Sequence, residues 1–188
     1  MTDHRIILFR GMNTGGVRAP VGEQREMAKA MGLNNPRTLQ ASGNLVVESD
    51  RATDALETAI EVEMERRFAT KIVAMARTPD QWTALIAANP FGEEATAHPA
   101  RVVAMVMKAG VLDGALEAVR GLCRDGEAVE AVRLEAIQIK DRDEVLYFWF
   151  PNGQGSSEIF KKATPKMLAM GTGRNWNTVL KLGEMVGL

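Results

Sequence analysis

The sequence has few of the residues from which disulfides and metal clusters are built. Among its 188 residues there is a single cysteine, Cys123, and there are two histidines, His4 and His98. One cysteine excludes an intrachain disulfide, and three such residues are too few for a structural zinc cluster. No histidine lies in a recognisable partner motif for Cys123. We therefore interpret this cysteine as a small core residue rather than a nucleophile.

Long apolar runs and a strong net charge are also missing. The run 6–9 is too short for a signal sequence, and no segment reaches the ~20 apolar residues that span a bilayer. The formal net charge of −1 provides no overall field to attract nucleic acid or an anionic membrane. We therefore expect a cytoplasmic protein without a membrane partner. A chain of 188 residues, 46% of them hydrophobic, suits one large domain or two small ones.

The charges that are present are unevenly distributed. Residues 156–188 contain five lysines and arginines against two glutamates, and residues 1–20 contain three arginines against one aspartate. The segment 111–144 has nine acidic residues against five basic ones. Both ends of the chain are therefore basic, and the middle compensates.

The first half of the chain predicts a βαββαβ unit. A helix is expected between Pro20 and Gly32, and a second over 53–68, where apolar residues recur every four positions. The unbroken apolar run in the first strand favours a central position, buried on both faces. This order is typical of a ferredoxin-like split βαβ fold, which we assign to residues 1–78. The strands are expected at 5–10, 37–41, 45–48 and 71–76, with a hairpin turn at 42–44.

Residues 79–100 are expected to connect this unit to a second half at 101–188. The segment Thr78-Pro79-Asp80-Gln81 predicts a capping box that opens a helix ending at Asn89-Pro90, and 91–99 predicts a loop. The second half repeats the first only loosely, so the predicted class is α+β, with a ferredoxin-like half packed against a second α+β half. Its expected elements are strands at 102–107, 129–134, 136–140 and 145–150, a helix across Leu112, Leu116 and Val119, a charged turn at 141–144, and a basic helix capped by Ser156 or Ser157.

The most unusual motif is Gly171-Thr172-Gly173-Arg174-Asn175-Trp176-Asn177-Thr178, directly before the apolar helical run 179–186. The start of a helix favours an anion, because free N–H groups and the helix dipole point there. As a ligand site, Arg174 would bind a phosphate or carboxylate, Asn175 and Asn177 would bind polar edges of the ligand, and Trp176 would stack on it. Thr178 is a further candidate ligand-binding residue. The structural alternative has Thr172 as the helix cap, Trp176 as a core anchor and Arg174 against a carboxylate of the same fold.

A second motif, Arg10-Gly11-Met12-Asn13-Thr14-Gly15-Gly16, follows the first strand. It matches neither a dinucleotide-binding nor a triphosphate-binding glycine loop. Arg10, Asn13, Gly15 and Gly16 are candidates for an anion nest at a strand-to-helix turn; the alternative is that the glycines only serve turns with positive φ.

Two further segments also allow a ligand-binding or a structural interpretation. Ser42 and Asn44 flank Gly43 in the expected hairpin, where they would either contact the ligand or form the turn. The expected basic helix carries Lys161 and Lys162, which would either add to an anion site or form a solvated face.

These motifs together resemble the bacterial DUF1697 family, a domain of unknown function. The resemblance covers nearly the whole chain and implies an α+β fold with a ferredoxin-like element, but no established activity, substrate or cofactor. One departure is in the first helix, where relatives tend to have Met-x-x-Leu and this chain has Val21 and Gln24. The matching segments are 9–16, Arg37-Thr38, 42–44, 89–91, Pro151 with Gly153, Thr172, 174–178 and 181–182.

The residues indicate binding more than catalysis. The chain has no serine-hydrolase, zinc-protease or Cys/His motif. We expect a phosphorylated small ligand or nucleotide in one cleft formed by the basic terminal motifs, with Arg10 and Arg174 close together. Nucleic acid ranks below a small ligand, because the expected strands lack an RNP pattern. An enzyme acting on a phosphorylated or carboxylated metabolite and a protein-interaction module are the alternatives, and the sequence indicates neither a cofactor nor an oligomeric state.

Overall fold

The computed structural model describes residues 3–12, 19–40, 43–134 and 144–188. The chain forms two compact units, Met1–Trp82 with Leu182–Leu188, and Thr83–Lys181. The last seven residues thus group with the first unit, whereas the sequence assigned them to the second half. The strand expected at 136–140 and most of the turn expected at 141–144 lie outside the described residues. No helix in the described ranges is long and apolar enough to span a membrane.

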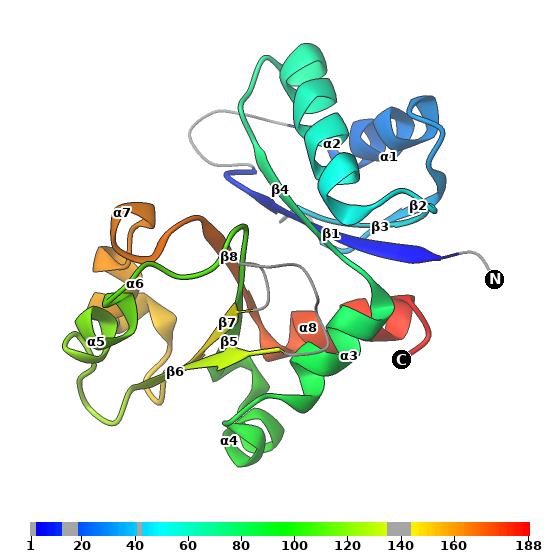
Figure 1. Cartoon of the computed structure of the whole chain (residues 1–188). Coiled ribbons are helices and arrows are strands. Elements are labelled where there is room, and N and C mark those ends of the chain that lie inside the picture. The colour runs from blue at the N-terminus through cyan, green and yellow to red at the C-terminus, as the bar shows by residue number, and fades with distance from the viewer. Residues whose placement is uncertain (1–2, 13–18, 41–42, 135–143) are drawn as a thin grey trace. The chain divides into compact units, whose positions relative to one another are not determined.

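The first unit contains a four-stranded antiparallel sheet in the order β2-β3-β1-β4 (Figure 1). This order is that of a ferredoxin-like sheet, so the predicted βαββαβ unit and the central first strand are confirmed. The second strand begins three residues earlier than expected, because an irregularity between Asn34 and Arg37 admits Pro36 into this edge strand. The elements are β1 (His4–Arg10), α1 (Val21–Ala30), β2 (Asn34–Thr38), β3 (Asn44–Glu48), α2 (Thr53–Phe68) and β4 (Val73–Arg77).

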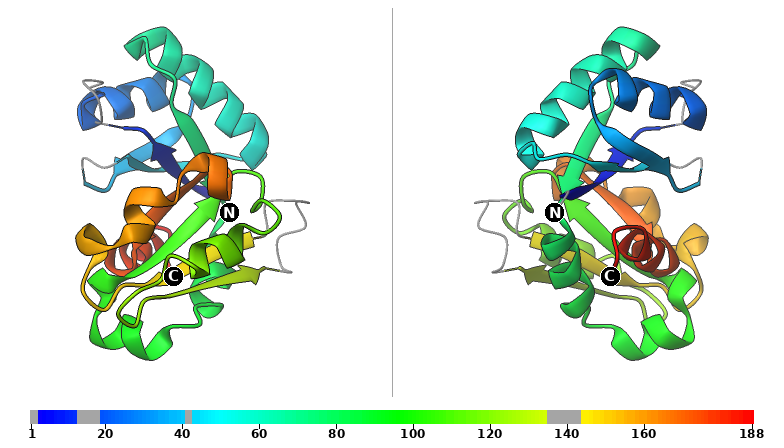
Figure 2. Two further views of the ribbon diagram at one scale, coloured as in Figure 1. Left: turned by 90° about the vertical axis from the view of Figure 1, so that its left-hand side faces the viewer. Right: turned by 90° about the vertical axis from the view of Figure 1, so that its right-hand side faces the viewer.

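Helices α1 and α2 cover one face of this sheet (Figure 2). Ile7 and Phe9 of β1 pack on that side with the apolar stripe of α2. Ile6 and Leu8 point the other way and are also fully buried, which confirms a first strand buried on both faces. The buried side chains of the α2 stripe are Leu56, Ile60 and Met64.

Helix α1 ends where the sequence predicts, at a glycine. Gly32 has φ +76° and donates to Lys29 O, while Leu33 donates to Ala28 O, which is a Schellman motif. At the other end of the helix, Gln24 is fully buried and its Nε2 donates to Ala19 O at 2.6 Å. Gln24, where the chain departs from the family pattern, is therefore held in the core by one hydrogen bond from Nε2, and its Oε1 has no partner among the described residues.

The second unit repeats the topology of the first. Its antiparallel sheet has the order β6-β7-β5-β8, which reproduces β2-β3-β1-β4 position by position. The two units resemble each other much more closely in structure than in sequence. The sequence hides the repeat, because two short helices take the place of α2 and the glycine-rich last strand lacks a strand-like pattern. The elements are β5 (Val102–Met107), α5 (Ala115–Arg120), β6 (Ala128–Arg133), β7 (Glu144–Trp149), α6 (Glu158–Lys162), α7 (Pro165–Leu168) and β8 (Gly171–Asn175).

A helix follows the last strand of each repeat: α3 (Pro79–Ala87) after β4 and α8 (Trp176–Met185) after β8. The predicted capping box opens α3, since Thr78 N donates to Gln81 Oε1 at 3.0 Å and Gln81 N donates to Thr78 Oγ1 at 3.2 Å. The prediction of a loop at 91–99 is wrong. Ala95 N donates to Phe91 O and closes a helical turn, so α4 (Gly92–Ala97) forms, and the short 3-10 helices are η1 (Pro99–Arg101) and η2 (Gln154–Ser156).

Carboxylates of α2 satisfy the outer edge of β4. Glu57 Oε1 accepts from Ala76 N at 2.7 Å, and Glu61 Oε1 accepts from Ala74 N at 2.9 Å. Glu57 also lies 3.7 Å from Nη1 of Arg77, and both side chains of this ion pair are buried. An edge strand exposes backbone donors that otherwise lack partners, and here the neighbouring helix supplies the acceptors.

We predict that Gly43→Ala destabilises the protein by about 1–3 kcal/mol, because the added Cβ meets a fixed part of the core. Gly43 has φ +81°, and a Cβ there would lie 3.0 Å from Phe9 Cβ. Gly155→Ala is the control, since nothing lies within 4 Å of that position. Denaturant unfolding measures both. Equal stability of the two variants would contradict the packing described for the hairpin.

We also predict that Glu57→Ala lowers the free energy of unfolding by about 3–5 kcal/mol, because it leaves the buried guanidinium of Arg77 without this carboxylate. Glu65→Ala on the same helix is the matched control, since Glu65 is exposed and its contact to Lys71 is 4.0 Å long. A loss of less than about 1 kcal/mol for Glu57→Ala in chemical denaturation would mean that the pair contributes no more than a surface ion pair.

Candidate functional site

The terminal motif is divided between strand β8 and the first turn of α8. Gly171 to Asn175 pair with β5, so the helix starts at Trp176 and not at the expected 179. A Cβ on Gly171 would lie 2.6 Å from Met107 Sδ, and one on Gly173 would lie 3.0 Å from Val103 Cγ1. The two glycines therefore allow the close approach of β8 to the side chains of β5.

Asn175 is the cap of α8. Its Oδ1 accepts from Thr178 N at 3.0 Å and from Thr178 Oγ1 at 2.9 Å, as an N-cap side chain does with the third helical residue. The structural interpretation that placed this cap at Thr172 is wrong, because Thr172 lies inside β8. Trp176 is only 6% exposed, which favours the core-anchor interpretation, and Asn177 is exposed.

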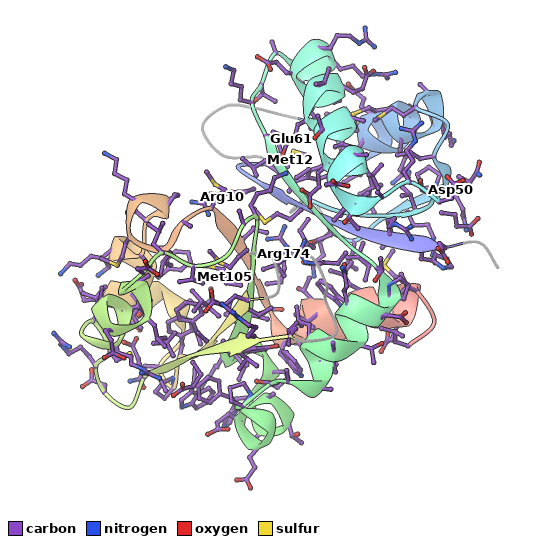
Figure 3. The ribbon with its side chains drawn as sticks, viewed as in Figure 1. Arg10, Met12, Asp50, Glu61, Met105 and Arg174 are labelled. Carbon is purple, nitrogen blue, oxygen red and sulfur yellow. The ribbon has the colours of Figure 1, made fainter. Side chains whose placement is uncertain are left out.

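Arg174 is half-buried and held by its own strand. Its side chain is labelled in Figure 3. Nη1 donates to Thr172 Oγ1 and to Gly173 O, both at 2.8 Å. Burial lowers the pKa of Arg174 to about 10, because the charged guanidinium loses part of its hydration. The side chain stays charged at neutral pH. It is thus a fixed and partly desolvated cation on the outer strand of the second sheet.

The repeat gives Arg174 a counterpart in the first unit. Arg77 ends β4 and is followed by the cap Thr78 and helix α3, as Arg174 is followed by the cap Asn175 and helix α8. Nη1 of Arg77 donates to the preceding carbonyl, Ala76 O, at 2.7 Å, which matches the bond from Arg174 to Gly173 O. The two arginines therefore occupy equivalent positions with the same backbone contact.

The first glycine-rich motif lies partly outside the described residues. Arg10 ends β1 and is half-buried, Gly11 has φ +85°, and Met12 packs in the core. Asn13, Gly15 and Gly16 lie outside the described ranges, and so does Ser42 of the hairpin. Arg10 belongs to the first unit and Arg174 to the second, so a single site formed by both remains a prediction.

Asn44 has a clear structural task. It is fully buried, and its Nδ2 donates to Leu39 O at 3.0 Å across the hairpin. The carbonyl of Gly43 accepts from Phe9 N at 2.8 Å, which ties the same turn to β1. These bonds favour the turn interpretation of the 42–44 segment for the residues that are described.

The lysines of α6 form a solvated face. Lys161 and Lys162 both pair with Glu158, at 3.2 and 2.9 Å, and all three side chains are exposed. The hydrogen bond from Lys162 is the main reason that the pKa of Glu158 is lowered. Ser157 caps this helix by accepting from Ile159 N at 3.1 Å, as one of the two predicted caps.

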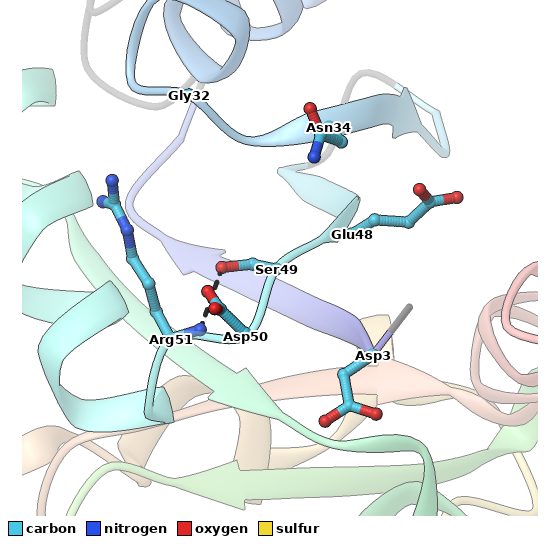
Figure 4. Close-up of a pocket in the computed structure, with 7 residues that line it drawn as sticks. All are labelled: Asp3, Gly32, Asn34, Glu48, Ser49, Asp50 and Arg51. Atoms are coloured by element: carbon cyan, nitrogen blue, oxygen red, sulfur yellow. Dashed lines mark hydrogen bonds between the residues drawn. The ribbon is translucent and has the colours of Figure 1, made fainter. Parts of the chain in front are cut away.

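One surface pocket of the first unit has the wrong charge for an anion. It has a volume of about 420 Å³ and contains three carboxylates against one arginine (Figure 4). None of the predicted site residues lines it, and across the described ranges no group of His, Cys, Asp or Glu could hold a metal ion. The lining residues are Asp3, Gly32, Asn34, Glu48, Ser49, Asp50 and Arg51.

Comparison with known proteins identifies a family and a fold. The model of the family described as "Protein of unknown function (DUF1697)" matches residues 1–136. The conserved bacterial protein SP0830 from Streptococcus pneumoniae has a similar structure, with 20% identity, a TM-score of 0.76 and 99% of both chains covered. Identity at this level indicates a shared fold alone. A structure described as "Putative Chlorite dismutase TA0507" covers 99% of this chain and 100% of its own, with 9% identity. Its TM-score of 0.31 is too low to indicate a shared fold. None of the curated proteins matches the chain.

We predict that Asn175→Ala lowers the stability by about 0.5–2 kcal/mol, because it removes the cap of α8, whereas Asn175→Asp preserves it. Thermal unfolding of the two variants beside the wild type checks this. Equal losses for Ala and Asp would show that the side-chain oxygen does not cap the helix.

Proposed function

The chain belongs to the DUF1697 family of proteins of unknown function, and from its residues we propose that it binds a small anionic ligand through Arg174 on β8. The ligand carries a phosphate or a carboxylate. A phosphorylated metabolite or a nucleotide is the ligand class that the sequence motif favours, ahead of nucleic acid.

The partly desolvated guanidinium of Arg174 carries this proposal. Its lowered pKa reflects lost hydration, and an anion placed against it restores favourable electrostatic interactions with the charged form. Two hydrogen bonds already hold Nη1, so little side-chain entropy is left to lose when a ligand arrives. Both properties strengthen a charge-assisted hydrogen bond relative to one made by an exposed, flexible arginine.

The equivalent position in the first repeat, that of Arg77, supports the same conclusion. In the first repeat the equivalent guanidinium is buried beside the carboxylate of Glu57, which the fold itself supplies. The connection between β7 and β8 contains one acidic residue, Glu158, and this residue pairs with two lysines of its own helix. The second repeat thus has the equivalent arginine, and the acid of its connecting segment forms a local pair on α6.

Binding, rather than catalysis, is what this geometry supports. Nη1 of Arg174 donates to a threonine hydroxyl and a backbone carbonyl, neither of which is a general acid or base at neutral pH. An enzyme at this site would have to act through electrostatic positioning alone.

The test compares wild type with Arg174→Gln in a thermal-shift and calorimetric screen of inorganic phosphate, nucleotides, sugar phosphates and carboxylates. We expect the variant to lose about 1.5–3 kcal/mol of binding free energy, the usual size of a charge-assisted hydrogen bond, with nearly unchanged unfolding. Arg66→Gln is the control, because Arg66 is exposed on α2 and pairs with Glu63 of the same helix. Ligands that raise the melting temperature report binding to the folded state.

A loss of about 3–5 kcal/mol of stability in Arg174→Gln, with no anion whose binding depends on Arg174, would contradict the proposal. Arg174 would then serve to fasten the C-terminal segment. Once a ligand is found, a double-mutant cycle with Arg10→Gln measures whether the two motifs act on the same anion: coupled losses of affinity support one site, and additive losses contradict it.

A further inference from the structure

We infer that the ligand group bound at Arg174 is a carboxylate, received by the N–H of Gly173 and the guanidinium of Arg174 as Glu57 is received in the first repeat. This inference rests on the proposed function and narrows the anion to one chemical class.

The N–H of Gly173 points away from the sheet. Lys108 N donates to Met170 O at 2.8 Å, which makes these two residues a hydrogen-bonded pair in the β5–β8 register. Such pairs alternate with non-hydrogen-bonded ones along an antiparallel ladder. The pair Met105 and Gly173, three positions further along, is therefore non-hydrogen-bonded, and the backbone groups of Gly173 face the outer edge of β8.

The contacts of Gly173 agree with this direction. Its carbonyl accepts from Arg174 Nη1 at 2.8 Å, on the outer side of the strand. Within the described part of the chain, no side chain accepts from its N–H. In the first repeat the equivalent N–H is that of Ala76, which also lies one residue before the arginine and points outward. There it donates to Glu57 Oε1 at 2.7 Å.

The first repeat therefore shows this arrangement with a carboxylate bound to it. One carboxylate oxygen of Glu57 accepts from the backbone N–H and lies 3.7 Å from Nη1 of Arg77, while Nη1 donates to the carbonyl of Ala76. The second repeat presents the same donor and the same guanidinium-to-carbonyl bond at Gly173 and Arg174. A ligand carboxylate placed on Gly173 N would reproduce the contacts of Glu57.

The number of donors favours a carboxylate over a phosphate dianion. One backbone N–H and one guanidinium match the single charge and two oxygens of a carboxylate. A phosphate dianion would bring a second charge and a third oxygen to a half-buried edge, where uncompensated charge is costly. The template in the first repeat is itself a carboxylate, buried with its arginine.

The experiment titrates wild type and Arg174→Gln with sodium acetate, sodium succinate and inorganic phosphate at constant ionic strength, with melting temperature and calorimetry as readouts. Acetate and succinate are expected to stabilise the wild type. Arg174→Gln should weaken their binding by about tenfold to a hundredfold, the equivalent of one charge-assisted hydrogen bond. Arg66→Gln should bind like the wild type. If Arg174→Gln does not fold, Arg174→Lys is used, which retains the charge and is expected to weaken binding because it loses the planar guanidinium.

Arg174-dependent binding of phosphate without binding of either carboxylate would overturn this inference and leave the proposed function intact. Carboxylate binding that is equal in wild type and the Arg174 variants would overturn it as well. If no anion binds in an Arg174-dependent way, both the inference and the proposed function fail.

Discussion

The backbone donors of an outer strand are the constraint on which this account depends. A strand at the edge of a sheet has N–H groups that face away from its neighbour, and each one needs an acceptor. In β4 the helix above the sheet supplies them, through Glu57 and Glu61. In β8 the glycines bring the strand close to β5, and the N–H of Gly173 faces outward beside a fixed guanidinium. We propose that this N–H and the guanidinium beside it form the ligand site of the second repeat.

The two outer strands differ because the helices that precede them differ in length. Both repeats have the same strand order and a capped helix after an arginine at the end of the last strand. In the first repeat the sixteen-residue helix α2 places two glutamates one turn apart along β4. In the second repeat α6 and α7 have five and four residues, and the one acid among them is paired within its own helix. The acids of the connecting segment therefore accept from the outer strand in the first repeat, whereas the acid in the second repeat pairs within its own helix.

Much of the first repeat could be predicted from the sequence, because its signals are local. The apolar run of β1, the four-residue stripe of α2 and the reciprocal cap at Thr78 and Gln81 each determine structure within a few residues. β8 could not be predicted in this way. Its glycines are required by methionine and valine side chains of β5, more than sixty residues earlier, and local propensity argues against a strand there. The same long-range pairing determines that the helix begins at Trp176.

The candidate site was predicted in part. Arg174 could be singled out from the sequence because a guanidinium among glycines and amides is unusual for a core, and the structure gives it a lowered pKa through burial. The role proposed for Gly173 depends on its being a non-hydrogen-bonded position of the β5–β8 pairing. No local sequence pattern reveals which residues of a strand take such positions. The most direct measurement is the amide resonance of Gly173 in a ¹⁵N-labelled sample titrated with succinate. The account predicts a saturable shift of this resonance that Arg174→Gln weakens strongly; a Gly173 amide that stays unmoved at saturating succinate, or moves equally in the variant, would contradict it.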